Sequence, residues 1–260
     1  MTATASPPLL TVVESPAYAP PGDPRATLLI ARRAALESLR DRTTMLMSAF
    51  FSLALPLLWV LLAIRPAAGG PQRNLGVLMA IYLLTVGLLP ATAASSVAAG
   101  QFAGEKEQGN LAPLLASPAS NRAIFGGKVL GAVLPALLYS AVAIASYLAE
   151  IALLVGPAKL RLLPPALSTA MVALVPVVAV FAAVVASLIS SRVRTFQAAQ
   201  NVSSLLLLPV LFGFFFLAGK MADWGAPALF GCVDALALAD VALLLAAAAT
   251  WRREEVLARR

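Results

Sequence analysis

Hydrophobic residues in this chain gather into six long runs that are separated by short polar segments. Each run is long enough to cross a hydrocarbon core about 30 Å thick as a helix, which needs about 20 residues. Backbone groups inside a bilayer must satisfy their own hydrogen bonds, so apolar runs of this kind are expected to be helical. The pattern predicts six transmembrane helices, at residues 43–64, 75–99, 129–155, 167–189, 198–218 and 229–250.

Residues 25–42 precede the first run and have an amphipathic pattern. At about 100° per residue, one face carries Leu28, Leu29, Ala31, Ala35, Leu36 and Leu39. The opposite face carries Arg33, Glu37, Arg40 and Asp41. This pattern predicts an N-terminal amphipathic helix on the inner leaflet, with a cytoplasmic extension of the first membrane helix as the alternative. The preceding residues 1–24 contain six prolines and predict a flexible cytoplasmic tail.

Two kinds of residue bear on the shape of the predicted helices. Proline occurs inside each of the first five runs, at Pro56, Pro90, Pro135, Pro176 and Pro209. Each proline removes a backbone hydrogen bond and favours a kink. Gly127 and Gly131 have the i, i+4 spacing that lets two helices approach closely, so they predict helix packing.

Composition supports the membrane class and narrows the chemistry. The chain is 60% hydrophobic and 12% charged, whereas soluble domains are about 45–50% apolar. It has no His and one Cys, Cys232. An internal disulfide, His-based metal sites, Ser-His-Asp triads and Cys-His nucleophiles are therefore excluded. We expect an all-α membrane protein with no catalytic residues, no metal site and no cofactor of its own.

The distribution of basic residues predicts the orientation. With the N-terminus in the cytoplasm, 14 of the 19 Lys and Arg residues face the cytoplasm and 5 face outward. This asymmetry agrees with the positive-inside rule and places both termini, including residues 251–260, inside the cell. The net charge of +7 is explained by this bias and by anionic inner-leaflet lipid, so no nucleic-acid partner is expected. The predicted location is the plasma membrane, with the chain crossing it several times.

A polar segment, residues 100–128, separates the second and third runs. It carries Glu105, Lys106 and Glu107. A short ridge of leucines follows, Pro118 ends it, and Ser120 is placed to cap the next helix. This order predicts a short amphipathic helix beneath the membrane that docks on a partner protein; the alternative is a solvated loop.

Residues 104–128 resemble the motif of ABC type-2 permeases, which reads approximately G-E-K-E-x-G-T-L-E-x-L-L-A-T-P-x-S-R and ends near G-K. The matching positions are Gly104, Glu105, Lys106, Glu107, Gly109, Leu111, Leu114, Leu115, Ala116, Pro118, Ser120, Gly127 and Lys128. The sequence departs from the motif at Asn110, Ala112, Ser117 and Asn121. Residues 190–200 resemble the loop before the fifth span in the sodium-export-like branch of the family, and residues 251–255 resemble its closing motif.

The resemblance implies a permease domain at residues 43–250 that exports substrate as a dimer with a second copy or a paralogue. It implies ATP hydrolysis on a separate nucleotide-binding subunit, which would hold the ATP and Mg. This chain contains no G-x-x-x-x-G-K-[ST] phosphate-binding loop, in agreement with that division. The implied ATPase-coupling residues are Glu105, Lys106, Glu107, Gly109, Leu111, Leu114, Leu115, Pro118, Arg192 and Arg194. The substrate is not identified by any motif.

Two acidic residues within the last run support a different reading. Asp234 and Asp240 are candidates for an intramembrane polar site because charge is costly in lipid. They would serve a stand-alone ion-coupled secondary transporter or channel. The simpler reading is that Asp234 is solvated and that Asp240 bonds to a neighbouring helix.

Overall fold

The computed structural model describes residues 23–91, 93–109 and 117–251. Within these ranges the chain forms helices and turns and no strand. The elements are α1 (Asp23–Arg40), α2 (Arg42–Trp59), η1 (Val60–Ile64), α3 (Arg65–Ala67), α4 (Gln72–Ala91), α5 (Ala93–Ala99), η2 (Gly100–Gly104), α6 (Glu105–Glu107), α8 (Asn121–Leu154), η3 (Pro157–Leu162), α9 (Pro165–Arg192), α10 (Phe196–Met221) and α11 (Ala226–Thr250). Two of the short elements, η1 and η2, are π-helical, and η3 is a 3-10 helix.

Five helical stretches among the described residues are long and apolar enough to cross a membrane. They are Arg42–Ala67, Asn74–Glu107, Asn121–Leu154, Pro165–Arg192 and Ala226–Thr250. Helix α10 is a further helix of 26 residues, about 39 Å long at 1.5 Å per residue. Each predicted apolar run therefore overlaps one long helix, and the prediction of an all-helical, multi-pass membrane protein is confirmed. Proline lies inside α2, α4, α8, α9 and α10, as predicted.

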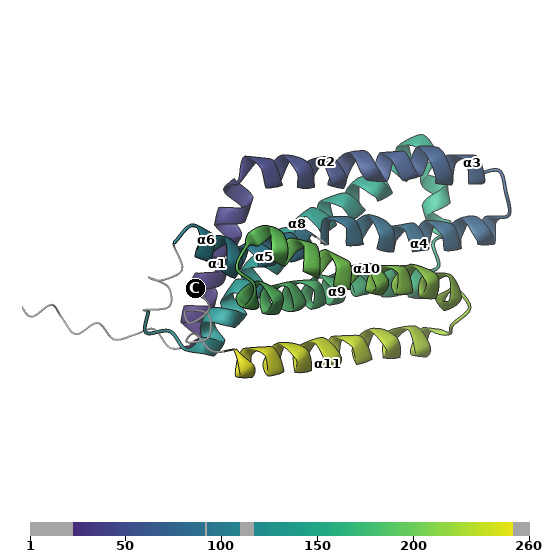
Figure 1. Ribbon diagram of the computed structural model, residues 1–260. Coiled ribbons are helices and arrows are strands. Elements are labelled where there is room, and N and C mark those ends of the chain that lie inside the picture. Colours follow the sequence, from purple (N-terminus) through teal and green to yellow (C-terminus); the bar gives the residue numbers. More distant parts are fainter. Residues whose placement is uncertain (1–22, 92, 110–116, 252–260) are drawn as a thin grey trace, which may run out of the picture.

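The long helices run side by side, and the two ends of the bundle differ (Figure 1). Helices α1 and α6 and the C-terminal end of α11 lie at one end, whereas α3 and the turn between α10 and α11 lie at the other. We call the first of these the α1 end. The connection between α10 and α11, from Met221 to Ala226, is a short turn.

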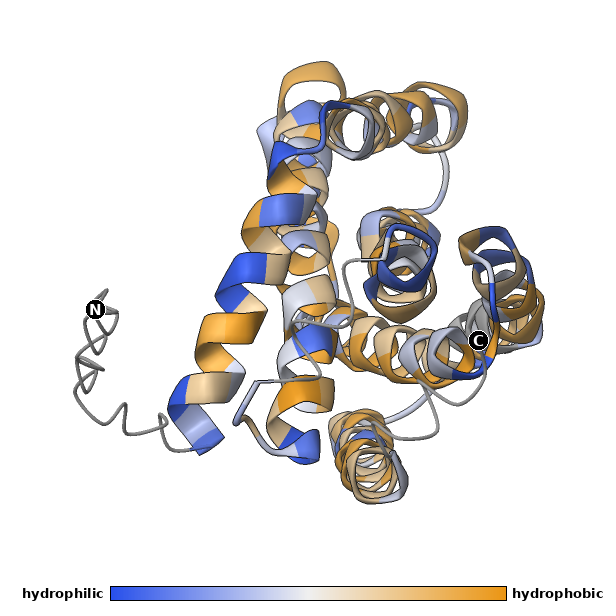
Figure 2. Cartoon of the chain, turned by 60° about the vertical axis from the view of Figure 1, so that its left-hand side comes forward, coloured by the Kyte–Doolittle hydropathy of each residue, from blue (hydrophilic) through white to orange (hydrophobic). Residues whose placement is uncertain are grey.

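Helix α1 lies across the α1 end and packs on α8 (Figure 2). Its buried residues are Ala26, Ala31, Ala34 and Ala35. The contact is close because α8 presents glycines there: a Cβ at Gly131 would lie 2.5 Å from Ala34 Cβ, and one at Gly127 would lie 2.8 Å from Ile30 Cβ. Packing at Gly127 and Gly131 is therefore confirmed.

The face of α1 predicted from the sequence is divided in the structure. Ala31 and Ala35 are buried against α8, but Leu28 and Leu29 are 66% and 57% exposed. The alanine edge of this face packs closely on the glycines of α8, whereas its leucine edge lies outside that contact. The placement of the helix on the inner leaflet stays a prediction. The leucine face of α1 is thus open to the surroundings of the protein.

Helix α8 begins earlier than the predicted membrane run. Ser120 caps it, as predicted, by accepting a hydrogen bond from the Ala123 N–H at 3.1 Å. The helix starts at Asn121, as that cap predicts, and the predicted membrane run begins within it. Lys128, which the sequence analysis assigned to the polar segment, lies inside this helix and is 1% exposed.

Candidate functional site

The helix that leads into the polar segment changes geometry at η2. Ser190, on α9, accepts a hydrogen bond from the Ala103 N–H at 2.9 Å and donates one to the Ala99 carbonyl. In an α-helix these two backbone groups would bond directly to each other. The Ser190 hydroxyl is therefore inserted into the backbone ladder, which is a known cause of local helix distortion.

Lys128, on α8, satisfies a second displaced group of the same turn. The Glu105 N–H is directed to the carbonyls of Gly100 and Phe102, and the Gln101 carbonyl accepts a hydrogen bond from Lys128 Nζ. The ammonium also lies 2.6 Å from Glu105 Oε2 and 4.9 Å from the centre of the Phe102 ring. A buried ammonium is costly unless it is paired and hydrogen-bonded, and here both conditions are met.

Three aromatic rings pack beside this ion pair. Phe102, Phe125 and Trp251 have ring-centre separations between 5.3 and 6.2 Å. These distances are in the range favoured by aromatic pairs. The cluster joins η2 to α8 and to the end of α11, so the base of the polar segment is held by three long helices, α8, α9 and α11.

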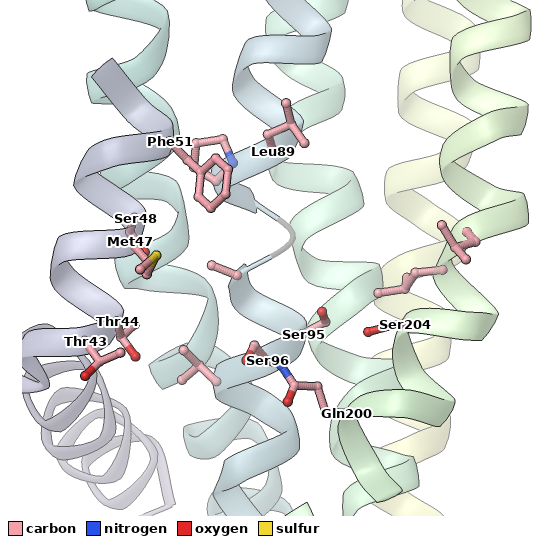
Figure 3. A pocket seen from close by; sticks show the side chains of 15 residues that line it. Thr43, Thr44, Met47, Ser48, Phe51, Leu89, Ser95, Ser96, Gln200 and Ser204 are labelled. Carbon is pink, nitrogen blue, oxygen red and sulfur yellow. Dashed lines mark hydrogen bonds between the residues drawn. The ribbon is translucent and has the colours of Figure 1, made fainter. Parts of the chain in front are cut away.

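A cavity of about 640 Å³ lies between α2, the α4–α5 segment and α10. We call it the hydroxyl-lined cavity (Figure 3). Its polar lining residues are Thr43, Thr44, Ser48, Ser95, Ser96, Gln200 and Ser204. None of its 15 lining residues is charged. The volume is within the usual range of about 300–1,000 Å³ for small-molecule sites.

Helical spacing explains why these side chains share one cavity. On α2, Thr44 and Ser48 are four residues apart, and so are Thr43, Met47 and Phe51 in succession. Residues at this spacing lie on one helix face. Across the cavity, Gln200 Nε2 donates a hydrogen bond to Ser96 Oγ at 3.1 Å and links α10 to α5.

A second pocket, of about 390 Å³, opens beside this cavity at the α1 end. It shares Thr44, Ser96 and Val97 with the hydroxyl-lined cavity. The described residues that line it include four carboxylates and no Lys or Arg; the carboxylates are Glu37, Asp41, Glu105 and Glu107. We call it the acidic pocket. Within the described ranges no group of three or more acidic or Cys side chains could hold a metal ion.

Two groups at the rim of the acidic pocket have shifted pKa values. Hydrogen bonds from the Thr44 hydroxyl and N–H lower the pKa of Asp41, which caps α2. A hydrogen bond and the charge of Glu37, 2.9 Å away, raise the pKa of Arg33. Both shifts favour the charged forms at neutral pH, so the rim keeps its charges.

Comparison with known proteins identifies the family. A family model described as ABC-2 type transporter matches residues 25–226. The chain belongs to the ABC-2 type transporter family. The match covers α1 and every long helix up to the start of α11, so this chain is the membrane permease component of an ABC transporter. A search of curated proteins found no match.

The structure brings part of the predicted coupling set of this ABC-2 permease together at the α1 end. Glu107 is exposed, and Lys106 Nζ lies 3.5 Å from the Val193 carbonyl, between the exposed Arg192 and Arg194. Gly109 has φ +72°, a backbone conformation that favours glycine, and Pro118 is exposed. Glu105 differs from the expectation of a displayed charge because its carboxylate is paired with Lys128. Leu111, Leu114 and Leu115 lie outside the described residues.

The two candidate aspartates are not brought together with these residues. Both lie on α11, where Asp234 is exposed and Asp240 is 8% exposed. The Asp240 Oδ2 atom has no hydrogen-bond partner among the described residues. The expected hydrogen bond between Asp240 and a neighbouring helix therefore does not involve Oδ2 as an acceptor within the described residues.

Sequence reasoning missed several residues of this region. Lys128 was assigned to the loop, and Ser96, Ser190 and Gln200 were given no individual role. One signal was available for Lys128, since a single basic residue within an apolar helix is expected to have a specific partner. No local signal marks Ser190, because its partners are 87 and 91 residues away in the sequence.

Proposed function

We propose that this chain is the transmembrane permease subunit of an ATP-binding cassette exporter and that a separate ATPase subunit drives it. The observation that carries the proposal is the hydroxyl-lined cavity, which meets the acidic pocket at Thr44, Ser96 and Val97. Together they lead from the α1 end into a bundle of membrane-length helices. An uncharged cavity of this volume suits a small molecule.

The polar segment at the α1 end supports the coupling role. Its exposed Glu107 follows Lys106, whose Nζ lies 3.5 Å from the Val193 carbonyl between Arg192 and Arg194. We propose that residues 105–118 include a coupling helix that contacts the ATPase, with a lesser contact from residues 190–195. The ATP and Mg would be held by that subunit, and this chain would carry no cofactor.

The proposed orientation places the α1 end in the cytoplasm and both termini inside the cell. In this arrangement all six long helices cross the plasma membrane. The exposed leucines of α1, Leu28 and Leu29, would then rest on the inner leaflet while its arginines meet lipid headgroups. A second permease chain would complete the transporter as a dimer, and the sodium-export-like branch is the one proposed from residues 190–200 and 251–255.

A stand-alone ion-coupled transporter or channel is the alternative. It would use Asp234 and Asp240 as ion ligands. One of these residues is exposed and the other is buried, and an i, i+6 spacing directs them about 120° apart. The alternative also leaves the acidic pocket and the exposed residues of the polar segment without a role.

Co-purification tests the proposal. The full-length chain is expressed with an affinity tag in its native membrane and extracted in mild detergent. We expect an ATPase with a phosphate-binding loop to be retained at a stoichiometric amount. Purification of an active transporter without any ATPase would support the ion-coupled alternative and overturn the proposal.

Two variants of the polar segment test whether that segment contacts the ATPase in the same co-purification experiment. Leu114→Ala with Leu115→Ala removes apolar anchors, whose truncation commonly costs about 2 kcal/mol or more, roughly thirtyfold in affinity. Glu107→Gln removes an exposed charge, which contributes little. We therefore expect the leucine variant to lose the ATPase more severely than the glutamate variant, with normal membrane insertion of both. Equal retention of the ATPase by both would count against a coupling helix in this segment.

A further inference from the structure

The π-helical turn η2 determines which way the first residues of the polar segment face. A π-helical turn contains one more residue than an α-helical turn. If η2 became α-helical, residues 105–107 would turn by about 100° around the helix axis. The direction of Glu105 and Glu107 therefore depends on whether this turn is kept.

The side chains that keep the turn come from two other helices. The Ser190 hydroxyl of α9 donates a hydrogen bond to the Ala99 carbonyl and accepts one from the Ala103 N–H. Lys128 Nζ of α8 donates a hydrogen bond to the Gln101 carbonyl. Both side chains are buried, at 0% and 1% exposure. Without the serine, the Ala99 carbonyl and the Ala103 N–H are free to bond to each other, which restores α-helical geometry.

The turn also adjoins the proposed substrate route. Gly100 and Gln101 of η2 line the acidic pocket, and Ser96 and Val97 of α5, one helical turn earlier, line both this pocket and the hydroxyl-lined cavity. A rotation at η2 therefore changes the direction of the acidic residues that follow it. It also changes the position of Ser96 and Val97, which precede it and line the cavity.

We propose that Lys128 and Ser190 are positioning residues for energy coupling: they hold η2 in its π-helical form and thereby set the direction in which Lys106 and the exposed Glu107 face the ATPase, while Glu105 stays paired with Lys128. This inference rests on the proposed function. It adds two residues that lie inside the bundle, away from the surface where the ATPase would bind.

The variants must separate positioning from simple loss of folding. Lys128→Met alone leaves Glu105 beside apolar groups without its counter-charge, which is destabilising. Lys128→Met with Glu105→Gln removes both charges and is expected to insert in the membrane at the wild-type amount. Ser190→Ala removes the inserted hydroxyl. The matched control is Ser191→Ala, because the neighbouring Ser191 hydroxyl donates only within its own helix, to the Leu188 carbonyl at 2.8 Å.

The first measurement reports the direction of the segment. A cysteine replaces Glu107 in a Cys232→Ser background, and its reaction rate with a maleimide is measured in inverted membrane vesicles. We expect the double variant and Ser190→Ala to shift this rate, whereas Ser191→Ala leaves it unchanged. Equal rates in all four chains would overturn the inference.

The second measurement reports coupling in the complex with the co-purified ATPase. A cysteine replaces Ser204 in the hydroxyl-lined cavity, and its labelling is compared with and without ATP and vanadate. We expect the nucleotide response of the wild type to be lost in the double variant and in Ser190→Ala, and kept in Ser191→Ala.

The outcomes distinguish the two proposals. A wild-type complex without any nucleotide response overturns the proposed function and this inference with it. A wild-type response that persists in the double variant and in Ser190→Ala overturns this inference alone. Loss of the response in Ser191→Ala as well would indicate a general packing defect and would also overturn it.

Discussion

At the scale of single residues, Lys128 is a charged side chain that is held inside a helix of membrane-spanning length. It is 1% exposed, and its ammonium contacts a carboxylate, a carbonyl and an aromatic ring. The polar residues around it in the sequence indicated a loop. A lone basic residue in an apolar helix signals a specific partner, but the sequence does not say which one, because Gln101 lies 27 residues away and is brought close by the packing of η2 on α8.

Asp240 is also buried, but unlike the paired ammonium of Lys128 its Oδ2 atom has no hydrogen-bond partner among the described residues. Asp240→Asn keeps the shape of the side chain and removes its capacity for charge. We expect the variant to assemble with the ATPase and to keep its nucleotide response, with stability changed by about 1 kcal/mol or less, the scale of hydrogen bonds in membrane proteins.

Thermal unfolding of the purified complex and labelling of the cavity cysteine measure these two quantities. Asp234→Asn is the control, because Asp234 is exposed on the same helix. A stable complex of the Asp240 variant that no longer responds to nucleotide would show that Asp240 binds a transported cation or proton, which would favour the ion-coupled alternative.

At the scale of elements, the long helices could be predicted from the sequence and the position of α1 could not. An apolar run of about 20 residues must satisfy its own backbone hydrogen bonds inside a bilayer, and an α-helix does so, so the helices can be predicted from the runs alone. Helix α1 has two apolar surfaces, one of alanines and one of leucines, and hydrophobic periodicity alone does not say which is buried. The glycines of α8 decide it, because they bring the backbone of α8 into close contact with Ala31 and Ala34.

The packing of α1 on α8 gives a prediction with a control one turn away. A Cβ at Gly131 would lie 2.5 Å from Ala34 Cβ and 3.0 Å from the Ala31 carbonyl oxygen, so Gly131→Ala forces the helices apart. Overpacking of this kind typically costs about 1–3 kcal/mol. A Cβ at Gly126 would lie 3.9 Å from its nearest neighbour, Thr27 Cγ2, so Gly126→Ala is expected to have little effect.

Protease sensitivity of α1 in detergent micelles measures the difference. We expect faster cleavage within residues 23–40 in Gly131→Ala than in the wild type, and partial restoration when Ala34→Gly is added to it. Equal cleavage of the Gly131 and Gly126 variants would contradict close packing at this crossing.

At the scale of the whole molecule, the chain has two chemically different ends. The α1 end carries Glu105, Lys106, Glu107, Arg192 and Arg194, whereas the other end has short connections at α3, η3 and the turn before α11. The surface between the ends is apolar, with Phe212, Phe216 and Leu238 each more than half exposed. Such a surface is suited to lipid or to a second permease chain.

The charge asymmetry of the two ends predicts the topology of the permease. Of the 19 basic residues, 14 are assigned to the α1 side and 5 to the other, so the α1 end is expected in the cytoplasm. Single cysteines at Gln72 and Lys220 should therefore react with an impermeant thiol reagent in intact cells, in a Cys232→Ser background. A cysteine at Glu107 should react only after the membrane is permeabilised.

Because Gln72, Lys220 and Glu107 are all exposed, a difference in labelling reports the side of the membrane rather than burial within the protein. Labelling of the Glu107 cysteine in intact cells would invert the topology and place the polar segment where no cytoplasmic ATPase could reach it.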